Sequence, residues 1–282
     1  MIMRRALLVV LLFALSAAGA ESPRRIVSLS PDLTEMLYGV GAFSFIVAVS
    51  DYDTYPPGVE KLPRLGQLHS PSLEKLMSMR PDLVVINSAQ GPLFEDSLKD
   101  LGIRYMEASN RSVAETYTAM MALGRATGNE AAAIKLVAAT RAGLDRVSRK
   151  TAQLPKRRVV LIVDRTPGTM RDLYTATSGS YLAELVQIAG GVIALPPVQG
   201  GYAKLRTEDL LAANPDVILD LIQGPINRFS GDPKEAWQEM PELQAVREHH
   251  VYSVNEDFVP HASQRMVQTA ELFARLIHPE IP

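Results

Sequence analysis

Short apolar runs rich in β-branched residues alternate along the chain with stretches of helical periodicity. Helix starts are marked by capping residues, as where Ser30 precedes Pro31 and where Ser112 stands three residues before Glu115. The alternation indicates an α/β fold with largely parallel sheets. The predicted strands are 26–29, 45–50, 82–87, 103–107, 158–163, 216–222 and 251–254, and the predicted helices are 31–38, 71–79, 112–126, 129–154, 179–189, 207–213, 235–239, 243–248 and 263–277.

The helix predicted at 129–154 divides the chain into two halves of similar pattern. It has no internal proline, and Pro155 ends it after about seven turns at roughly 3.6 residues per turn. Each half contains an acidic helix start and a later Pro-Asp pair at the same offset, which predicts a duplicated lobe. The pairs are Glu74 with Pro81-Asp82 and Glu208 with Pro215-Asp216. The predicted domains are 22–127 (N-terminal lobe), 128–155 (linker helix) and 156–282 (C-terminal lobe).

Two α/β lobes joined by one stiff helix leave a cleft between them. Ligands of open parallel sheets bind beyond the carboxyl ends of the strands. If both lobes point those ends inward, the loops after the strands line one shared site. Because a single helix crosses between the lobes, only a modest closure of the cleft is expected.

The first twenty residues have the layout of a secretory signal peptide. Arg4 and Arg5 precede an apolar run at 6–15, and Ala18 and Ala20 form an A-x-A arrangement. Cleavage is predicted after Ala20, and the run is short for a membrane span. We therefore expect an exported protein, with the periplasm as its compartment.

Composition narrows the possible functions. The chain has no cysteine, which excludes a thiolate metal site, a catalytic thiol, disulfides and a lipid-modified cysteine. The formal net charge is −2, with acidic and basic residues interspersed, so nucleic acid is not an expected partner. A monomer is expected.

Catalytic motifs are not found along the sequence. There is no G-x-S-x-G elbow, no P-loop and no G-x-G-x-x-G after a predicted strand, so an enzyme is not predicted. His69 and His261 lie in loops expected to face the cleft, one from each lobe. Two histidines do not complete a closed zinc site, which generally takes four ligands, and no metal site is predicted.

Aromatic residues in the cleft loops indicate a binding site more strongly than the histidines do. Tyr52, Tyr55, Tyr202 and Phe258 stand in loops rich in proline and glycine. Aromatic faces with a few polar groups are typical of sites for large planar ligands. The alternative is that each ring packs back onto its own lobe.

At these residues the chain resembles a known family, the periplasmic binding proteins of cobalamin and iron-siderophore ABC transporters. That resemblance implies two Rossmann-like lobes bridged by one long helix. Tyr-Pro-Pro at 55–57 and the segment from Asp257 to Arg265 are similar to the cobalamin branch. The motifs that carry the resemblance are Arg25–Pro31 with Thr34 and Glu35, Ser50–Tyr52 with Tyr55–Pro57, Leu73–Leu76 with Arg80–Val84, and Gly179–Leu182 with Ala189–Gly191.

The resemblance also implies a ligand site. Leu68 and Tyr202 fall where the best-known cobalamin binders place tryptophans, and the single tryptophan, Trp237, lies elsewhere. The expected ligand is a transported cobalt corrinoid rather than a resident cofactor. The predicted ligand-binding residues are Tyr52, Tyr55, Leu68, His69, Tyr202, Asp257, Phe258, Val259, Pro260 and His261.

Two alternatives to a corrinoid stay open. An iron-siderophore or haem fits the same class of transporter. Arg64, Arg206 and Arg228 lie near the expected cleft, where they would suit an anionic chelate, and His69 or His261 could ligate haem iron. A hydrolase on the same lobes is the third possibility.

The resemblance implies a transporter partner as well. Glu74 and Glu208 match the acidic residues, one on each lobe, that pair with arginines of an ABC permease dimer. The alternative is that each glutamate only complements the N-terminus of its helix, which is worth about 0.3–1 kcal/mol.

Overall fold

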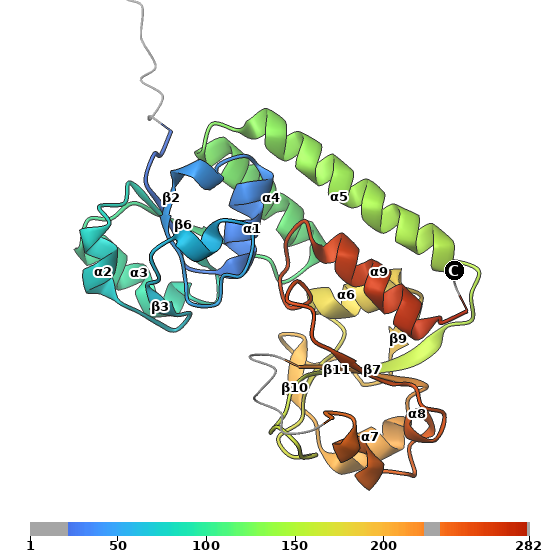
Figure 1. Ribbon diagram of the computed structural model, residues 1–282. Helices are drawn as coiled ribbons and strands as arrows, with labels where there is room; N and C mark the ends of the chain where they lie inside the picture. Colours follow the sequence, from blue (N-terminus) through green and yellow to red (C-terminus); the bar gives the residue numbers. More distant parts are fainter. Residues whose placement is uncertain (1–21, 223–231, 281–282) are drawn as a thin grey trace, which may run out of the picture.

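In the computed structural model, which describes residues 22–222 and 232–280, the chain forms two α/β lobes. Figure 1 shows the lobes side by side, with helix α5 running along both of them. The predicted signal peptide and Arg228 lie outside the described residues.

The N-terminal lobe is built on a four-stranded parallel sheet in the order β2-β1-β5-β6. Each face of this sheet carries its own apolar core, one under α1 and α4 and the other under α2 and α3. The strands are β1 (Ile26–Ser28), β2 (Ile46–Ala48), β5 (Leu83–Asn87) and β6 (Tyr105–Ala108), with a small pair β3 (Gly66–Gln67) and β4 (Ser70–Pro71) beside them. The helices are α1 (Pro31–Gly39), α2 (Leu73–Ser78), α3 (Gly91–Asp100) and α4 (Val113–Ala126), with short 3-10 turns at Phe43–Phe45 and Val59–Lys61.

The C-terminal lobe has a mixed sheet in the order β10-β8-β7-β11-β12, with β9 also paired to β7. Strands β9, β7, β11 and β12 pair in parallel, whereas β8 pairs antiparallel with β7 on one side and with β10 on the other. The strands are β7 (Arg157–Asp164), β8 (Tyr174–Ala176), β9 (Gly191–Ile193), β10 (Tyr202–Lys204), β11 (Val217–Leu221) and β12 (Val251–Val254). The helices are α6 (Tyr181–Ile188), α7 (Thr207–Ala213), α8 (Gln244–Arg247) and α9 (Met266–Ile277), with a 3-10 turn at Glu235–Glu239.

The two lobes repeat one arrangement. The series β2-β1-β5-β6 corresponds to β9-β7-β11-β12. In both lobes the aspartate of the Pro-Asp pair binds the chain that enters the neighbouring strand. The Asp82 carboxylate accepts from the N–H groups of Arg24 and Arg25 at 2.7 and 3.0 Å, and Asp216 accepts from the N–H of Arg158 at 2.7 Å. The repeated Pro-Asp pair therefore has the same structural role twice.

Helix α5 (Glu130–Thr151) contributes to both cores. Its first turns pack with α4 in the N-terminal lobe, and Leu144 and Val147 belong to the core of the C-terminal lobe. Its 22 residues span about 33 Å at roughly 1.5 Å per residue. Gly143 allows the close approach of α9, because a Cβ there would lie 2.8 Å from both methyl carbons of Val267. Helix α5 is thus packed against both lobes.

The structure differs from the sequence-based expectation at several elements. Helix α3 was missed because its first residues, Gly91-Pro92, are typical of a turn; here proline occupies the first helical turn, where its missing N–H costs nothing. The antiparallel strands β8 and β10 were also missed. The domain boundaries at 127/128 and 155/156 stay predictions.

Candidate ligand-binding site

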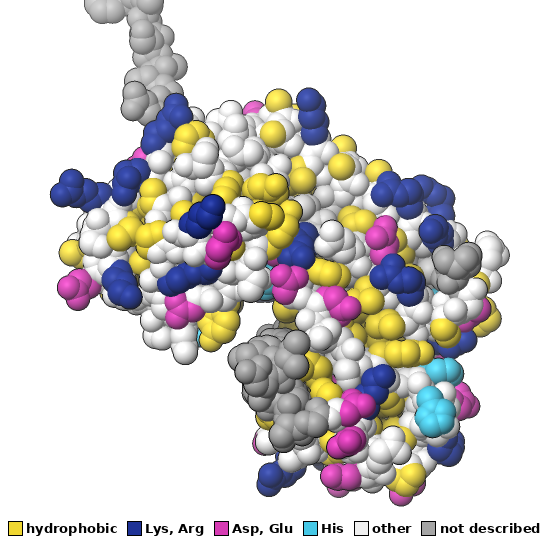
Figure 2. All heavy atoms as spheres, viewed as in Figure 1, with side chains coloured by type: hydrophobic (Ala, Val, Ile, Leu, Met, Phe, Trp, Pro, Cys, Tyr) yellow, Lys and Arg dark blue, Asp and Glu magenta, His cyan; other side chains and the backbone are white. Residues whose placement is uncertain are grey.

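A cavity of about 580 Å³ lies between the two lobes, and Figure 2 shows the surface deeply indented there. Its walls come from loops at the carboxyl ends of strands in both sheets, as parallel-sheet folds favour. The lining residues are Ser30, Pro31, Asp32, Tyr52, Gln67, Leu68, His69, Asn87, Ala89, Asn110, Arg111, Tyr181, Tyr202, Pro260, His261 and Ala262.

Several of the residues expected from the sequence lie in this wall: Tyr52, Leu68, His69, Tyr202, Pro260 and His261. A second cavity of about 420 Å³ shares Tyr52, Pro260 and His261 with the first and adds Asp257 and Val259. The two spaces therefore adjoin along one strip of wall.

Tyr55 and Phe258 are placed differently from expectation. Neither lines the two cavities between the lobes. Instead the Arg265 guanidinium carbon lies 4.4 Å from the ring centre of Tyr55 and 5.1 Å from that of Phe258. Both rings thus pack on a cation, a contact worth about 0.5–2 kcal/mol, rather than facing a ligand.

The aromatic part of the wall combines one exposed ring with two that are held in place. Tyr52 is 50% exposed, and its ring is free to meet a ligand. The Tyr181 hydroxyl donates to the carbonyl of Val259 at 2.7 Å. Burial raises the pKa of Tyr202 to about 12, so its hydroxyl stays protonated. Such a wall offers apolar faces with neutral hydroxyl groups.

A polar cluster in the N-terminal lobe faces the same cavity. Asp32 accepts hydrogen bonds from the Ser30 hydroxyl, from Asn87 Nδ2 at 3.1 Å and from Asn110 Nδ2. Asn87 Nδ2 also donates to Asn110 Oδ1 at 2.8 Å. Burial raises the pKa of Asp32 above its usual value. We call Asp32, Asn87 and Asn110 the amide cluster.

Sequence reasoning missed the amide cluster because it followed aromatic rings and histidines. A signal was present, since Asn87 ends β5 and Asn110 follows β6 by two residues. Polar residues at the carboxyl ends of adjacent parallel strands meet at one edge of the sheet.

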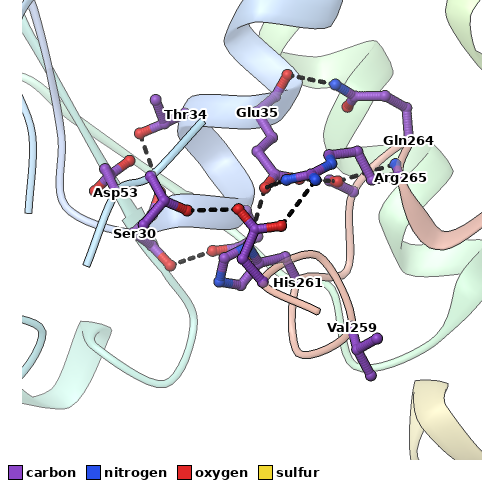
Figure 3. A network of polar contacts seen from close by, with 12 residues as sticks. Ser30, Thr34, Glu35, Asp53, Val259, His261, Gln264 and Arg265 are labelled. Carbon is purple, nitrogen blue, oxygen red and sulfur yellow. Dashed lines mark hydrogen bonds and ion pairs between the residues drawn. The ribbon is translucent and has the colours of Figure 1, made fainter. Parts of the chain in front are cut away.

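Glu35 of α1 joins the two lobes through a network of polar contacts (Figure 3). Its buried carboxylate binds Nδ1 of His261 at 2.9 Å and Nη1 of Arg265 at 3.0 Å, and it accepts from the Ser263 hydroxyl. Its backbone carbonyl accepts from Gln264 Nε2 at 2.7 Å. The segment 257–265, which lines both cavities, is thereby attached to the opposite lobe.

The same attachment determines what His261 can do. Burial lowers the pKa of the imidazole, but the hydrogen bond and charge of Glu35 outweigh it, so the pKa is raised overall. Since Glu35 occupies Nδ1, only Nε2 is left for a ligand in the cavity.

The arginines expected to serve an anionic chelate are placed elsewhere. Arg64 Nη1 donates to the carbonyls of Ser50 and Asp53, both at 2.8 Å, and so braces the loop that carries Tyr52. Arg206 pairs with Asp209 at the exposed start of α7. Among the described residues that line the larger cavity, Arg111 is the one arginine.

Glu74 and Glu208 are exposed in the first turns of α2 and α7. These two helices lie at the ends of the lobes that are far from α5 (Figure 1). Over residues 22–222 and 232–280, no group of three or more His, Asp or Glu is placed to hold a metal ion. No helix in that part of the chain is long and apolar enough to cross a bilayer.

Comparisons with known proteins agree with this architecture. Residues 26–258 match the family described as periplasmic binding protein. The chain belongs to that family. The uncharacterized ABC transporter substrate-binding lipoprotein YvrC of Bacillus subtilis is 28% identical over 267 residues, which are 92% of this chain and 82% of YvrC.

Solved structures of the family carry different ligands. The periplasmic vitamin B12 binding protein BtuF of Vibrio cholerae superposes with a TM-score of 0.77 at 25% identity, over 91% of this chain and 97% of BtuF. IsdE of Staphylococcus aureus, complexed with heme, superposes with a TM-score of 0.76 at 25% identity, over 90% and 98%. The chain is thus a substrate-binding protein of the ABC-transporter class, with relatives that bind vitamin B12 and relatives that bind heme.

Proposed function

We propose that this member of the family captures a corrinoid between its lobes in the periplasm and delivers it to an ABC importer. The observation that carries the proposal is the composition of the cavity wall. Aromatic and aliphatic side chains (Tyr52, Leu68, Tyr202) meet the amide cluster across one space of about 580 Å³. Flat apolar walls with a few polar groups suit a large planar ligand whose rim carries amides.

Two further observations support a corrinoid over an anionic chelate. Arg64 and Arg206 are engaged in bonds away from the cavity. Asp32 adds a carboxylate to the wall, where a ligand with several carboxylates would meet a like charge. BtuF is named as a binding protein and IsdE is complexed with heme, which supports capture rather than turnover.

Titration of the purified protein tests the ligand. Cyanocobalamin, hemin and a ferric hydroxamate siderophore are added separately, and visible spectra together with Trp237 fluorescence are recorded. We expect saturable binding of cyanocobalamin and a weaker response to the other two. A protein that binds hemin or the siderophore but gives no response to any corrinoid would refute the assignment.

Haem is the second candidate, and His69 is the observation that favours it. Its side chain is exposed in the wall of the larger cavity. Among the described residues, no acidic side chain forms an ion pair with it. If haem were the cargo, His69→Ala would shift the Soret band of the complex. If a corrinoid is the cargo, the same variant leaves the spectrum of bound cyanocobalamin unchanged.

A further inference from the structure

Among the four buried carboxylates of the described residues, Asp32 and Asp53 have no ion pair, and of these two only Asp32 lines the cavity. Glu35 pairs with Arg265, and Asp220 pairs with Arg165. Asp32, only 5% exposed, is bonded by a hydroxyl and two side-chain amides and by no cation. A buried carboxylate without a cation is costly, so its presence calls for a reason beyond folding.

The helix itself does not require an acidic residue at this position. An aspartate in a first turn complements the helix dipole. However, the oxygens of Asp32 are bonded to side chains. Helix α6 stands at the equivalent place in the other lobe, and after its cap Ser180 it has the buried Leu182 where α1 has Asp32. The carboxylate is therefore a feature of the cavity in the N-terminal lobe.

The hydrogen bonds within the amide cluster leave two capacities unused. A carboxylate accepts about four hydrogen bonds, and Asp32 receives three from the protein. The Asn87 amide donates both of its hydrogens, whereas Asn110 donates one of two. What is left is one acceptor site on Asp32 and one donor on Asn110, two residues that are bonded to each other and that both line the cavity.

An acceptor and a donor on bonded residues match a primary carboxamide, which offers N–H donors and a C=O acceptor on one group. They do not match a carboxylate, which brings only acceptors and a charge of the same sign as Asp32. We propose that the amide cluster is a specificity-determining subsite that receives a peripheral carboxamide of the ligand and rejects a carboxylate in its place. The inference rests on the proposed function, because corrinoids carry such amides on their rim.

The charges that face Asp32 support this assignment. The charge of His261 favours the ionised form of Asp32, but its Nδ1 is bonded to Glu35, and Glu35 itself adds a negative field. Arg111 lines the same cavity but forms its ion pair with Glu115 at 3.6 Å. The cluster thus presents a neutral-to-negative surface, which favours a donor from the ligand.

The experiment compares cyanocobalamin with its monocarboxylic acids, in which one peripheral amide is hydrolysed. Dissociation constants are measured for the wild-type protein and for Asp32→Asn, which has nearly the same shape. Asp100→Asn, an exposed aspartate at the end of α3, is the matched control for the loss of one charge. A second variant, Asn110→Ala, removes the donor, and circular dichroism and the melting temperature confirm that each variant folds.

We expect wild type to bind the amide at least roughly tenfold more tightly than one of the acid isomers, which corresponds to one lost charge-assisted hydrogen bond. Asp32→Asn should reduce that preference to within about twofold, and Asn110→Ala should weaken binding of the amide. Asp100→Asn should leave both constants unchanged.

Two outcomes overturn the inference and are distinguishable. If wild type binds cyanocobalamin but binds every acid isomer equally, or if Asp32→Asn retains the wild-type preference, the subsite assignment alone is wrong. If wild type binds no corrinoid, the proposed function is wrong and the subsite assignment with it.

Discussion

The two lobes repeat one topology but treat the buried carboxylate at their strand ends differently. In the C-terminal lobe, Asp220 binds the Arg165 guanidinium at 2.8 Å and accepts from Trp237 Nε1 at 2.9 Å, and both charged side chains are almost fully buried. In the N-terminal lobe, Asp32 is bonded only by neutral groups and lies in the cavity wall.

With the proposed subsite, this difference assigns a structural role to Asp220 and a recognition role to Asp32. The Arg165 guanidinium also donates to the carbonyls of Thr169 and Pro233, so the pair holds together the loops that follow β7 and precede the turn carrying Trp237. Asp32 also joins segments, since it accepts from Asn87 at the end of β5 and from Asn110 after β6, but it has no ion pair and it lines the cavity. A duplicated fold can thus hold the loops of one lobe with a buried ion pair and keep a carboxylate without one in the other lobe.

Removing the carboxylate of the buried ion pair should have the largest effect on stability. Asp220→Ala removes the carboxylate that binds the buried guanidinium of Arg165, and we expect a loss of about 3–5 kcal/mol in the free energy of unfolding. Urea denaturation measures it. Asp32→Asn is the paired variant in the N-terminal lobe, and it should change stability by less than about 1 kcal/mol, because the amide has nearly the same shape and Asp32 has no ion pair to lose. Equal losses in the two variants would contradict the contrast between the lobes.

Glu35 is a third buried carboxylate, and it works between the lobes. Glu35→Ala removes bonds to His261, Ser263 and Arg265 together. We expect a loss of about 2–4 kcal/mol, less than for Asp220, because Arg265 keeps its 2.9 Å contact with Asp257. Ligand affinity should fall as well, since the segment 257–265 loses its attachment.

A control separates the two effects of Glu35. Thr54→Val removes a hydrogen bond between the lobes at this place that does not involve Glu35, from Thr54 to Asp257 at 2.8 Å. It should cost about 1 kcal/mol or less, because the pair is exposed. If Thr54→Val destabilises as much as Glu35→Ala, Glu35 is not the main link.

The pH dependence of this link has a definite sign. Glu35 raises the pKa of His261 in the folded protein above its ordinary 6.5, in spite of burial. A raised histidine pKa means that the folded state binds the proton more tightly, so the contribution is complete below about pH 6.5 and is lost as the pH rises through the folded value. The stability difference between wild type and His261→Gln, about 1 kcal/mol at pH 6, should shrink toward pH 8. A difference that grows with pH would show that the neutral imidazole makes the stabilising contact.

The sequence predicts more of the fold than of the candidate site. Alternating strands and helices, the long helix at 129–154 and the repeated Pro-Asp pairs are local patterns, and α7 has the predicted bounds 207–213. The failures are long-range. The sequence around Tyr55 and Phe258 does not indicate that Arg265 lies against both rings. The partners of the Glu35 carboxylate stand 226 or more residues away in the chain.

The histidines illustrate the same limit. His69 and His261 were both expected at the cleft, and both line the cavity. Only the three-dimensional structure separates them, since the side chain of His261 is held by Glu35 whereas that of His69 is exposed. The chemistry of a loop residue depends on partners that sequence spacing does not encode.

The smallest expected effect concerns the place where the lobes are most alike. Glu74 and Glu208 occupy equivalent first turns of α2 and α7, and both are exposed. If each pairs with an arginine of a permease subunit, the double variant Glu74→Ala plus Glu208→Ala should weaken association with the transporter by roughly three- to tenfold, since exposed ion pairs contribute about 0.2–1 kcal/mol each. The two single variants should share this loss about equally, and cyanocobalamin affinity should not change. Glu130→Ala plus Glu271→Ala removes two exposed charges on the α5 and α9 side and is the control. Equal weakening in the control would assign the effect to net charge, and a loss confined to one single variant would mean that the lobes dock by different means.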